Sequence, residues 1–294
     1  MPNEILSRTA LSKHRGGLTD YVSASRLSLW LRCPLAFKFR YVDGIRTPPS
    51  ANLFLGKRVH DGLEYYYRHA QAGVRLSGPE VARHIARHWE GAADAEQIVW
   101  EKADDSQSLL TKCQALVACY LDRFANAGEQ ILGVESAMEA TLLDPVTGER
   151  LALPMVGIVD LLVETNDGPI LVDFKTVGRG GTPVAQQHEI QLGCYSLLFR
   201  ELMGTLESGL EIRSLVKTKR PRVEVHRFEP RSARHLGRLF TVIREYLKAI
   251  QRGVFNFRPG MACLFCDVRE THCQTWSGHR SPIQKEEDGI WANC

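Results

Sequence analysis

The chain has 294 residues, enough for one large domain with an appended module or for two small domains, and we expect the first arrangement. Its composition, 44% hydrophobic and 24% charged, is that of an ordinary soluble globular protein. The net charge of +3 is too small to indicate nucleic-acid binding by itself. No apolar run is as long as a membrane span, and the N-terminus has no signal-peptide core, so we expect an intracellular, cytoplasmic protein.

The first half of the chain has the apolar periodicity of amphipathic helices. Ser23 or Ser25 can cap the first helix, and Pro34 interrupts the helix pattern just after Cys33. His60 lies on the inward face of a longer helix, where a histidine can be either a core residue or a metal ligand. After a flexible segment over 1–22, we expect helices from Ser23 to Cys33, around Phe37 to Tyr41, from Asn52 to about Ala70, over 78–92 and over 106–127.

The second half of the chain alternates strand patterns with helix patterns. Glu135 lies in the first strand, where it is either an exposed strand residue or part of a site. We expect strands over 131–143, in a hairpin around residue 166, over 210–218 and over 222–229, and helices over 185–203 and 231–252. This order predicts an α/β fold in which helices flank a mixed central β-sheet.

Three ionisable residues, Asp160, Asp173 and Lys175, interrupt the two apolar runs of this hairpin. A turn between Asn166 and Asp167 sets Asp160 opposite Asp173, whereas a turn placed one residue later sets Asp160 opposite Lys175. Either register brings the two carboxylates together, and Lys175 points from the same face of its strand as Asp173. Such a cluster is costly to desolvate unless its charges are paired or hold a cation. A salt bridge and a cation site are therefore both open interpretations.

A second group of candidate ligands is formed by cysteines near the end of the chain. Cys263, Cys266 and Cys273 fall within eleven residues, and cysteines of an intracellular protein are expected to be reduced, which favours a metal over disulfides. Four thiolates suit either tetrahedral zinc or an iron–sulfur cluster, and unligated core cysteines are the other interpretation. Candidates for the fourth ligand are Cys33, Cys194, Cys294 and His272. We favour Cys33, because the break before Pro34 lets a ligand project.

Basic residues are unevenly distributed in the last third of the chain. Runs of this kind are usually solvated faces, but they can also follow a phosphate backbone. The residues concerned are Arg213, Lys217, Lys219, Arg220, Arg222, Arg227, Arg231, Arg234 and Arg238.

Taken in order, these residues resemble the RecB-like branch of the PD-(D/E)xK nucleases. The motifs that carry the resemblance are His60 on a helix, Gly157-Ile-Val-Asp160, Val172-Asp-Phe-Lys175 and Gln191-x-x-x-Tyr195. Asp173 is the aspartate variant of the acidic–x–Lys element, which the family permits. The early Cys33 and the three late cysteines are similar to those of the subset whose nuclease domain is clasped by a 4Fe-4S cluster, as in CRISPR-associated RecB-like exonucleases and AddB-type helicase–nuclease subunits. The resemblance covers about residues 23–276.

The resemblance implies a restriction-endonuclease-like core, a DNA substrate and roles for individual residues. His60, Asp160 and Asp173 would hold one or two Mg²⁺ or Mn²⁺ ions, with the Phe174 carbonyl as a further ligand. Lys175 would orient or deprotonate the attacking water. Gln191 and Tyr195 would line the groove beside the site, although core packing is the alternative for Tyr195. The 4Fe-4S cluster would be held by Cys33, Cys263, Cys266 and Cys273.

The implied protein is an exonuclease on single-stranded or end-containing DNA. The expected division of the chain is a flexible N-terminus (1–22), a helical region (23–130), the nuclease core (131–254), an iron–sulfur segment (255–276) and a flexible tail (277–294). One alternative function is a catalytically inactive DNA-binding or assembly subunit of a recombination, repair or CRISPR-adaptation complex. The other is a zinc-stapled or electron-transfer protein.

Overall fold

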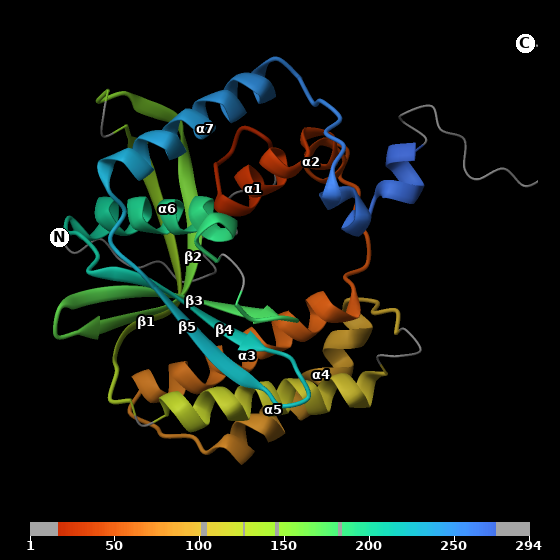
Figure 1. The fold of residues 1–294 in the computed structure, drawn as a ribbon, viewed down its shortest axis with the longest axis vertical. Helices are drawn as coiled ribbons and strands as arrows, with labels where there is room; N and C mark the ends of the chain where they lie inside the picture. The colour runs from red at the N-terminus through yellow and green to blue at the C-terminus, as the bar shows by residue number, and fades with distance from the viewer. Residues whose placement is uncertain (1–16, 101–104, 126, 145–146, 182–183, 275–294) are drawn as a thin grey trace, which may run out of the picture.

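The computed structural model describes residues 17–100, 105–125, 127–144, 147–181 and 184–274 (Figure 1). Most of the N-terminal segment and all of the tail that were expected to be flexible lie outside these residues. Val22, the last residue of that N-terminal segment, is fully buried and forms a bridge with Met155. None of the described helices is both long and apolar enough to cross a membrane.

The described elements follow the predicted order of helices, strands, one crossover helix and further strands. They are α1 (Ala24–Arg32), α2 (Pro34–Tyr41), α3 (Ala51–Gln71), α4 (Gly78–Ala95), α5 (Ser106–Phe124), β1 (Gln130–Leu143), β2 (Arg150–Thr165), β3 (Gly168–Val177), α6 (Val184–Met203), β4 (Gly209–Val216), β5 (Arg222–Phe228) and α7 (Ala233–Gln251). A 3₁₀ turn (Met261–Phe265) and a short π-helix (Arg269–Cys273) follow α7. The α/β fold is therefore confirmed.

The five strands form one mixed sheet in the order β1-β2-β3-β4-β5. Strands β3 and β4 are parallel and joined through α6, and the other three neighbouring pairs are antiparallel. Figure 1 shows β1 and β2 extending beyond the other strands toward α7. In the β2–β3 hairpin, Thr165 pairs with Gly168 and Leu161 pairs with Val172. The turn therefore lies between Asn166 and Asp167, which confirms the first of the two predicted registers.

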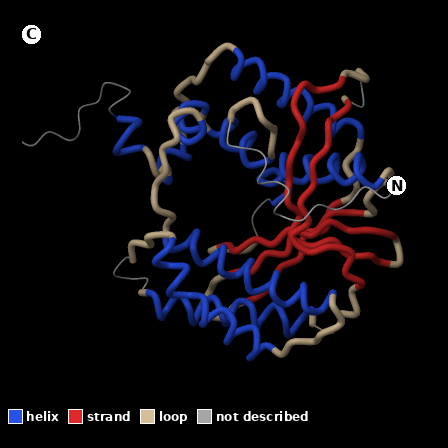
Figure 2. Tube along the Cα trace, turned by 180° about the vertical axis from the view of Figure 1, so that it is seen from behind, coloured by secondary structure: helices blue, strands red, loops and turns tan. Residues whose placement is uncertain are grey.

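Two layers of helices cover the two faces of the sheet, and each layer has its own apolar core (Figures 1 and 2). The core between the sheet and α1, α6 and α7 includes Leu27, Leu198 and Phe240, all of them buried. The core under α3, α4 and α5 is built from larger rings, among them Phe54 and Trp89, which meet edge to face with ring centroids 4.9 Å apart. Because both faces are covered, polar groups on the central strands are withdrawn from water.

Local sequence signals explain where the helices near the site begin and end. The Ser23 side chain accepts a hydrogen bond from Arg26 N at the start of α1, and Ser50 accepts one from Leu53 N at the start of α3. Pro34 occupies the first turn of α2, so Cys33 ends α1 and precedes α2 in an extended conformation. The break predicted from Cys33-Pro34 is therefore present.

Candidate metal centre and active site

The candidate site lies where the β2–β3 hairpin opens. The last regular pair toward the open end of the hairpin is Leu161 with Val172, and the next residue on each strand is an aspartate, Asp160 on β2 and Asp173 on β3. There Asp160 Oδ2 accepts a hydrogen bond of 2.6 Å from the Phe174 backbone N–H, so a carboxylate replaces the missing partner of the strand. Asp160 is 8% exposed and Asp173 is 2% exposed. The opening of the hairpin therefore sets two buried carboxylates side by side.

Glu135 enters the same place from β1. Its neighbours Val134 and Ser136 pair with Leu161 and Val159, so Glu135 lies opposite Asp160. Its φ of 45° is in the left-handed region, which costs an L-residue about 1–2 kcal/mol, and the side chain is only 7% exposed. The interpretation of Glu135 as an exposed strand residue was wrong. A bulge in β1 between Ile131 and Gly133 accompanies this geometry and was not visible in the sequence pattern.

His60 approaches the carboxylates from α3, which packs against β1 and β3. Its Nδ1 lies 3.4 Å from Asp160 Oδ1, and its ring meets Phe174 edge to face at a centroid distance of 6.0 Å. Burial acts to lower the pKa of His60, but the charge of Asp160, the hydrogen bond with Asp160 and the charge of Asp173 together outweigh burial, so the net pKa is raised. One ligand atom from each of His60, Glu135 and Asp160 can be chosen so that all three lie within 4.8 Å of one another.

Two side chains, Lys175 of β3 and Gln191 of α6, contact the carboxylate of Asp173. Lys175 Nζ lies 2.6 Å from Asp173 Oδ2, and Gln191 Nε2 donates to Asp173 Oδ1 at 2.7 Å. Gln191 Nε2 also lies 2.7 Å from the Tyr195 hydroxyl, one turn further along α6. The predicted residues Asp160, Asp173, Lys175, Gln191 and Tyr195 are thus brought together. Their catalytic roles, and metal ligation by Asp173 and the Phe174 carbonyl, stay predictions.

The electrostatics of the site favour a bound cation. Burial raises the pKa of Asp173 to about 6, with Asp160 adding to the rise and Lys175 opposing it. Burial also acts to raise the pKa of Asp160, but His60, Lys175 and the Phe174 N–H together hold it below the ordinary value. Carboxylate oxygens with one imidazole suit Mg²⁺ or Mn²⁺, and their buried negative charge is what a divalent cation offsets. The donor set therefore fits the expected metal.

The four predicted cluster ligands, although far apart in the sequence, line one small cavity. Cys33 comes from the α1–α2 junction, whereas Cys263, Cys266 and Cys273 come from the two short turns after α7. The apolar residues Leu35, Ala36 and Phe39 also line this cavity. Within the described part of the chain, the group of potential ligands lying within 4.8 Å of one another is the His60 group, not the cysteines. A cluster held by these cysteines stays a prediction.

The alternative candidates for a fourth cysteine-site ligand have other surroundings. Cys194 is 1% exposed and packs in the core under α6, and burial raises its pKa to about 12. His272 is half-buried, with Nδ1 2.8 Å from the Thr271 hydroxyl. Cys294 lies outside the described residues. Of the two candidate cysteines that the structure describes, Cys33 and Cys194, Cys33 lines the cavity, as expected from the break at Pro34.

The run of basic residues does not form one surface. Arg213 is 2% exposed and is paired with Glu129 and Glu211, and its Nη1 donates to Tyr120 at 2.8 Å. Arg231 is also buried and pairs with Glu189. These two arginines stabilise the fold, so the interpretation of the whole run as a solvated or phosphate-binding face was wrong for them. Arg220 is exposed in the β4–β5 turn.

The site thus consists of adjacent buried acidic residues and a lysine where the β2–β3 hairpin opens, with a glutamine from the crossover helix α6. The family model of the PD-(D/E)XK nuclease superfamily matches residues 21–274, and the chain belongs to this superfamily. A Eubacterium rectale protein that carries the provisional name of exonuclease has a similar fold, with a TM-score of 0.55 at 12% identity over 89% of this chain and 92% of the other.

A second solved structure, SSO0001, matches with a TM-score of 0.36 and 12% identity, covering 83% of this chain and 92% of that one. At 12% identity, the similarity to the Eubacterium rectale protein concerns the fold alone. No curated protein sequence matches the chain.

Proposed function

We propose that the chain is a metal-dependent deoxyribonuclease, an exonuclease acting on single-stranded or end-containing DNA. The observation that carries the proposal is the convergence of His60, Glu135 and Asp160 within 4.8 Å, directly beside the Asp173–Lys175 pair. A buried acidic group of this kind is costly without a cation, and superfamily membership supplies the reaction class.

His60, Glu135, Asp160 and Asp173 would hold one or two Mg²⁺ or Mn²⁺ ions, with the Phe174 carbonyl as a further ligand. A bound divalent ion supplies Lewis-acid polarisation of the phosphoryl oxygen and a lowered pKa of a bound water. Lys175 Nζ stands 2.6 Å from Asp173 Oδ2, so its ammonium would lie beside a phosphate bound at the metal, where it would offset developing negative charge and orient the water. Gln191 holds Asp173 in place and contacts Tyr195.

The four cysteines at the small cavity would hold a 4Fe-4S cluster with a structural role. Four thiols from two distant segments are the donor set that such a cluster takes. Linking Cys33 to Cys263, Cys266 and Cys273 closes a loop of over two hundred residues, which ties the first helices to the end of the chain. The cluster would therefore act as a clasp around the catalytic sheet.

The test is digestion of end-labelled linear and circular single-stranded DNA with Mn²⁺ by wild type, Lys175→Ala and the matched control Lys248→Ala. Lys248 is an exposed lysine of α7 that pairs with Glu245. We expect loss of cleavage in Lys175→Ala with DNA binding retained, and shortening of linear but not circular DNA by wild type. Unchanged cleavage by Lys175→Ala refutes the site. DNA binding without any cleavage by wild type supports the assembly subunit instead.

A further inference from the structure

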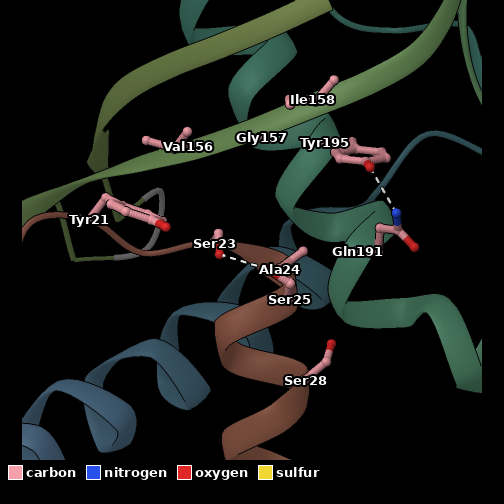
Figure 3. A pocket seen from close by; sticks show the side chains of 10 residues that line it. All are labelled: Tyr21, Ser23, Ala24, Ser25, Ser28, Val156, Gly157, Ile158, Gln191 and Tyr195. Atoms are coloured by element: carbon pink, nitrogen blue, oxygen red, sulfur yellow. Dashed lines mark hydrogen bonds between the residues drawn. The ribbon is translucent and has the colours of Figure 1, made fainter. Parts of the chain in front are cut away.

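Two surface cavities meet along the exposed side of α1. The first, of about 540 Å³, is lined by Tyr21, Ser23, Ala24, Ser25, Ser28, Val156, Gly157, Ile158, Gln191 and Tyr195 (Figure 3). The second, of about 380 Å³, is lined by residues that include Arg32, Arg40, Tyr41 and Asp267. Ser25 and Ser28 line both cavities. The two cavities therefore form one continuous depression, called here the α1 groove.

One end of the α1 groove touches the catalytic residues. Gln191 lines the first cavity and also donates the 2.7 Å hydrogen bond to Asp173. Ile158, two residues before Asp160 on β2, lines the same cavity. Figure 3 shows the serines of α1 on one side of the cavity and Gln191 and Tyr195 of α6 on the other. A chain lying in the groove therefore passes directly beside the proposed scissile position.

The groove follows one face of the helix. Ser25, Ser28 and Arg32 are three and four residues apart, so they lie in a row, and all three are exposed. The rise of the helix puts about 10 Å between the first and the last of them. Arg40, also exposed, extends this row from α2. The groove thus has a direction, from the catalytic residues to the helix junction that carries Cys33.

The chemistry changes along the groove in a way that fits one nucleic-acid strand. Near the site the walls include the half-buried Tyr21, whose ring can stack on a base, and the exposed serines Ser25 and Ser28, whose hydroxyls can act as donor or acceptor for any base or sugar. At the far end Arg32 and Arg40 supply positive charge for phosphates, and Asp267 is the one carboxylate lining that cavity. Cavities of these volumes have the size of small-molecule sites, which take a nucleotide or two rather than a duplex.

We infer that the α1 groove is the binding track for a single DNA strand, which runs from the catalytic carboxylates past Ser25 and Ser28 to Arg32 and Arg40. The inference rests on the proposed nuclease function and deepens it, because it commits the substrate to an unpaired strand. Recognition is independent of sequence, since stacking and hydroxyl contacts accept every base.

The experiment measures the binding of a fluorescein-labelled 12-nucleotide single strand by anisotropy in EDTA, where no hydrolysis occurs, across a salt series. The variants are Ser28→Trp, which places a bulky side chain where the two cavities meet, and Arg40→Ala at the far end of the groove. The controls are Gln107→Trp and Arg83→Ala, exposed residues of α5 and α4 on the opposite face of the sheet. Thermal melting confirms that each variant is folded, and Ser25→Asp replaces Ser28→Trp if the latter does not fold.

We expect Ser28→Trp or Ser25→Asp to weaken binding at least ~10-fold, equivalent to ~1.4 kcal/mol. Arg40→Ala lowers the slope of log affinity against log salt by ~0.7, the value for one lost phosphate contact to a single strand. The controls bind as wild type does. Binding by the groove variants that equals wild type overturns the track, and so does an equal loss in the controls.

This readout separates the two proposals. Wild type that binds through the groove but hydrolyses no DNA with Mn²⁺ refutes the nuclease function and leaves the track in place. If hydrolysis is lost in Lys175→Ala but Ser28→Trp and Arg40→Ala bind DNA as wild type does, the nuclease function stands and only the track is refuted. A duplex of the same sequence that competes as well as the single strand also refutes the track.

Discussion

Replacing Asp173 by asparagine is expected to stabilise the metal-free protein. The Asp173 carboxyl is 2% exposed, and burial raises its pKa from 3.8 to about 6. Ionising this group in the folded state therefore costs about 3 kcal/mol, at ~1.4 kcal/mol for each pH unit. The amide in Asp173→Asn avoids this cost, and its oxygen still accepts the hydrogen bond from Gln191. The contact with Lys175 is already included in this value, because Lys175 opposes the rise in the pKa.

The sign of the pH dependence follows from the raised pKa. The folded state holds the Asp173 proton more tightly than the unfolded state, so this group lowers the stability of the wild type as pH rises from about 4 to about 6. Below that window the two proteins differ little, and above it the advantage of the variant is constant. Urea unfolding in EDTA between pH 4 and pH 8 measures the difference in free energy of unfolding.

Adding Mn²⁺ should reverse the order of stability at pH 8. A ligand that binds only the folded state stabilises it by mass action, and the wild type retains the carboxylate that the ion requires. Asp173→Asn is then the less stable protein, and it cleaves no DNA. A variant that is less stable than wild type in EDTA at pH 8, or a difference that does not change between pH 4 and pH 6, refutes the electrostatic account of the site.

Three further predictions follow from other features. Glu135→Gly and Glu135→Ala both weaken Mn²⁺ binding measured by calorimetry, but the glycine variant is more stable by ~1 kcal/mol because φ is 45°, and equal stability contradicts the strain. Cys266→Ala lowers iron content, solubility and cleavage together, whereas Cys119→Ala does not, and a colourless but folded and active Cys266→Ala protein rules out the clasp. Gly62→Val lowers the melting temperature through a loss of ~1–3 kcal/mol, since a Cβ at Gly62 would lie 2.8 Å from Ile85 Cδ1; an unchanged melting temperature contradicts close packing of α3 on α4.

The parts of the fold that depend on local chemistry could be predicted from the sequence. Asn166 and Asp167 set the turn, and that turn fixed the register that brings Asp160 next to Asp173. Ser23, one of the two predicted caps, begins α1, and Pro34 marks the break between α1 and α2 in the same way. Features of this kind are decided by residues only a few positions apart.

Features that depend on distant residues could not be predicted. Glu135 belongs to the metal group only because β1 adopts a positive φ there and bulges two residues earlier, and neither leaves a mark in the apolar pattern. In the sequence, Arg213 belongs to a run of basic residues that suggests a charged surface. In the fold it pairs with Glu129, which is 84 residues away in the sequence. The burial of both residues follows from tertiary packing, which overrides local composition.

The three residues that can hold the metal ion come from three separate elements of the fold. His60 belongs to α3, Glu135 to β1 and Asp160 to β2, so one cation coordinated by all three would connect the helical layer to the two long strands. Loading the metal should then slow amide hydrogen exchange in α3 as well as in the strands. Such an ion would be a reversible cross-link between these elements, so the rigidity of the catalytic sheet would depend on the concentration of the metal in solution.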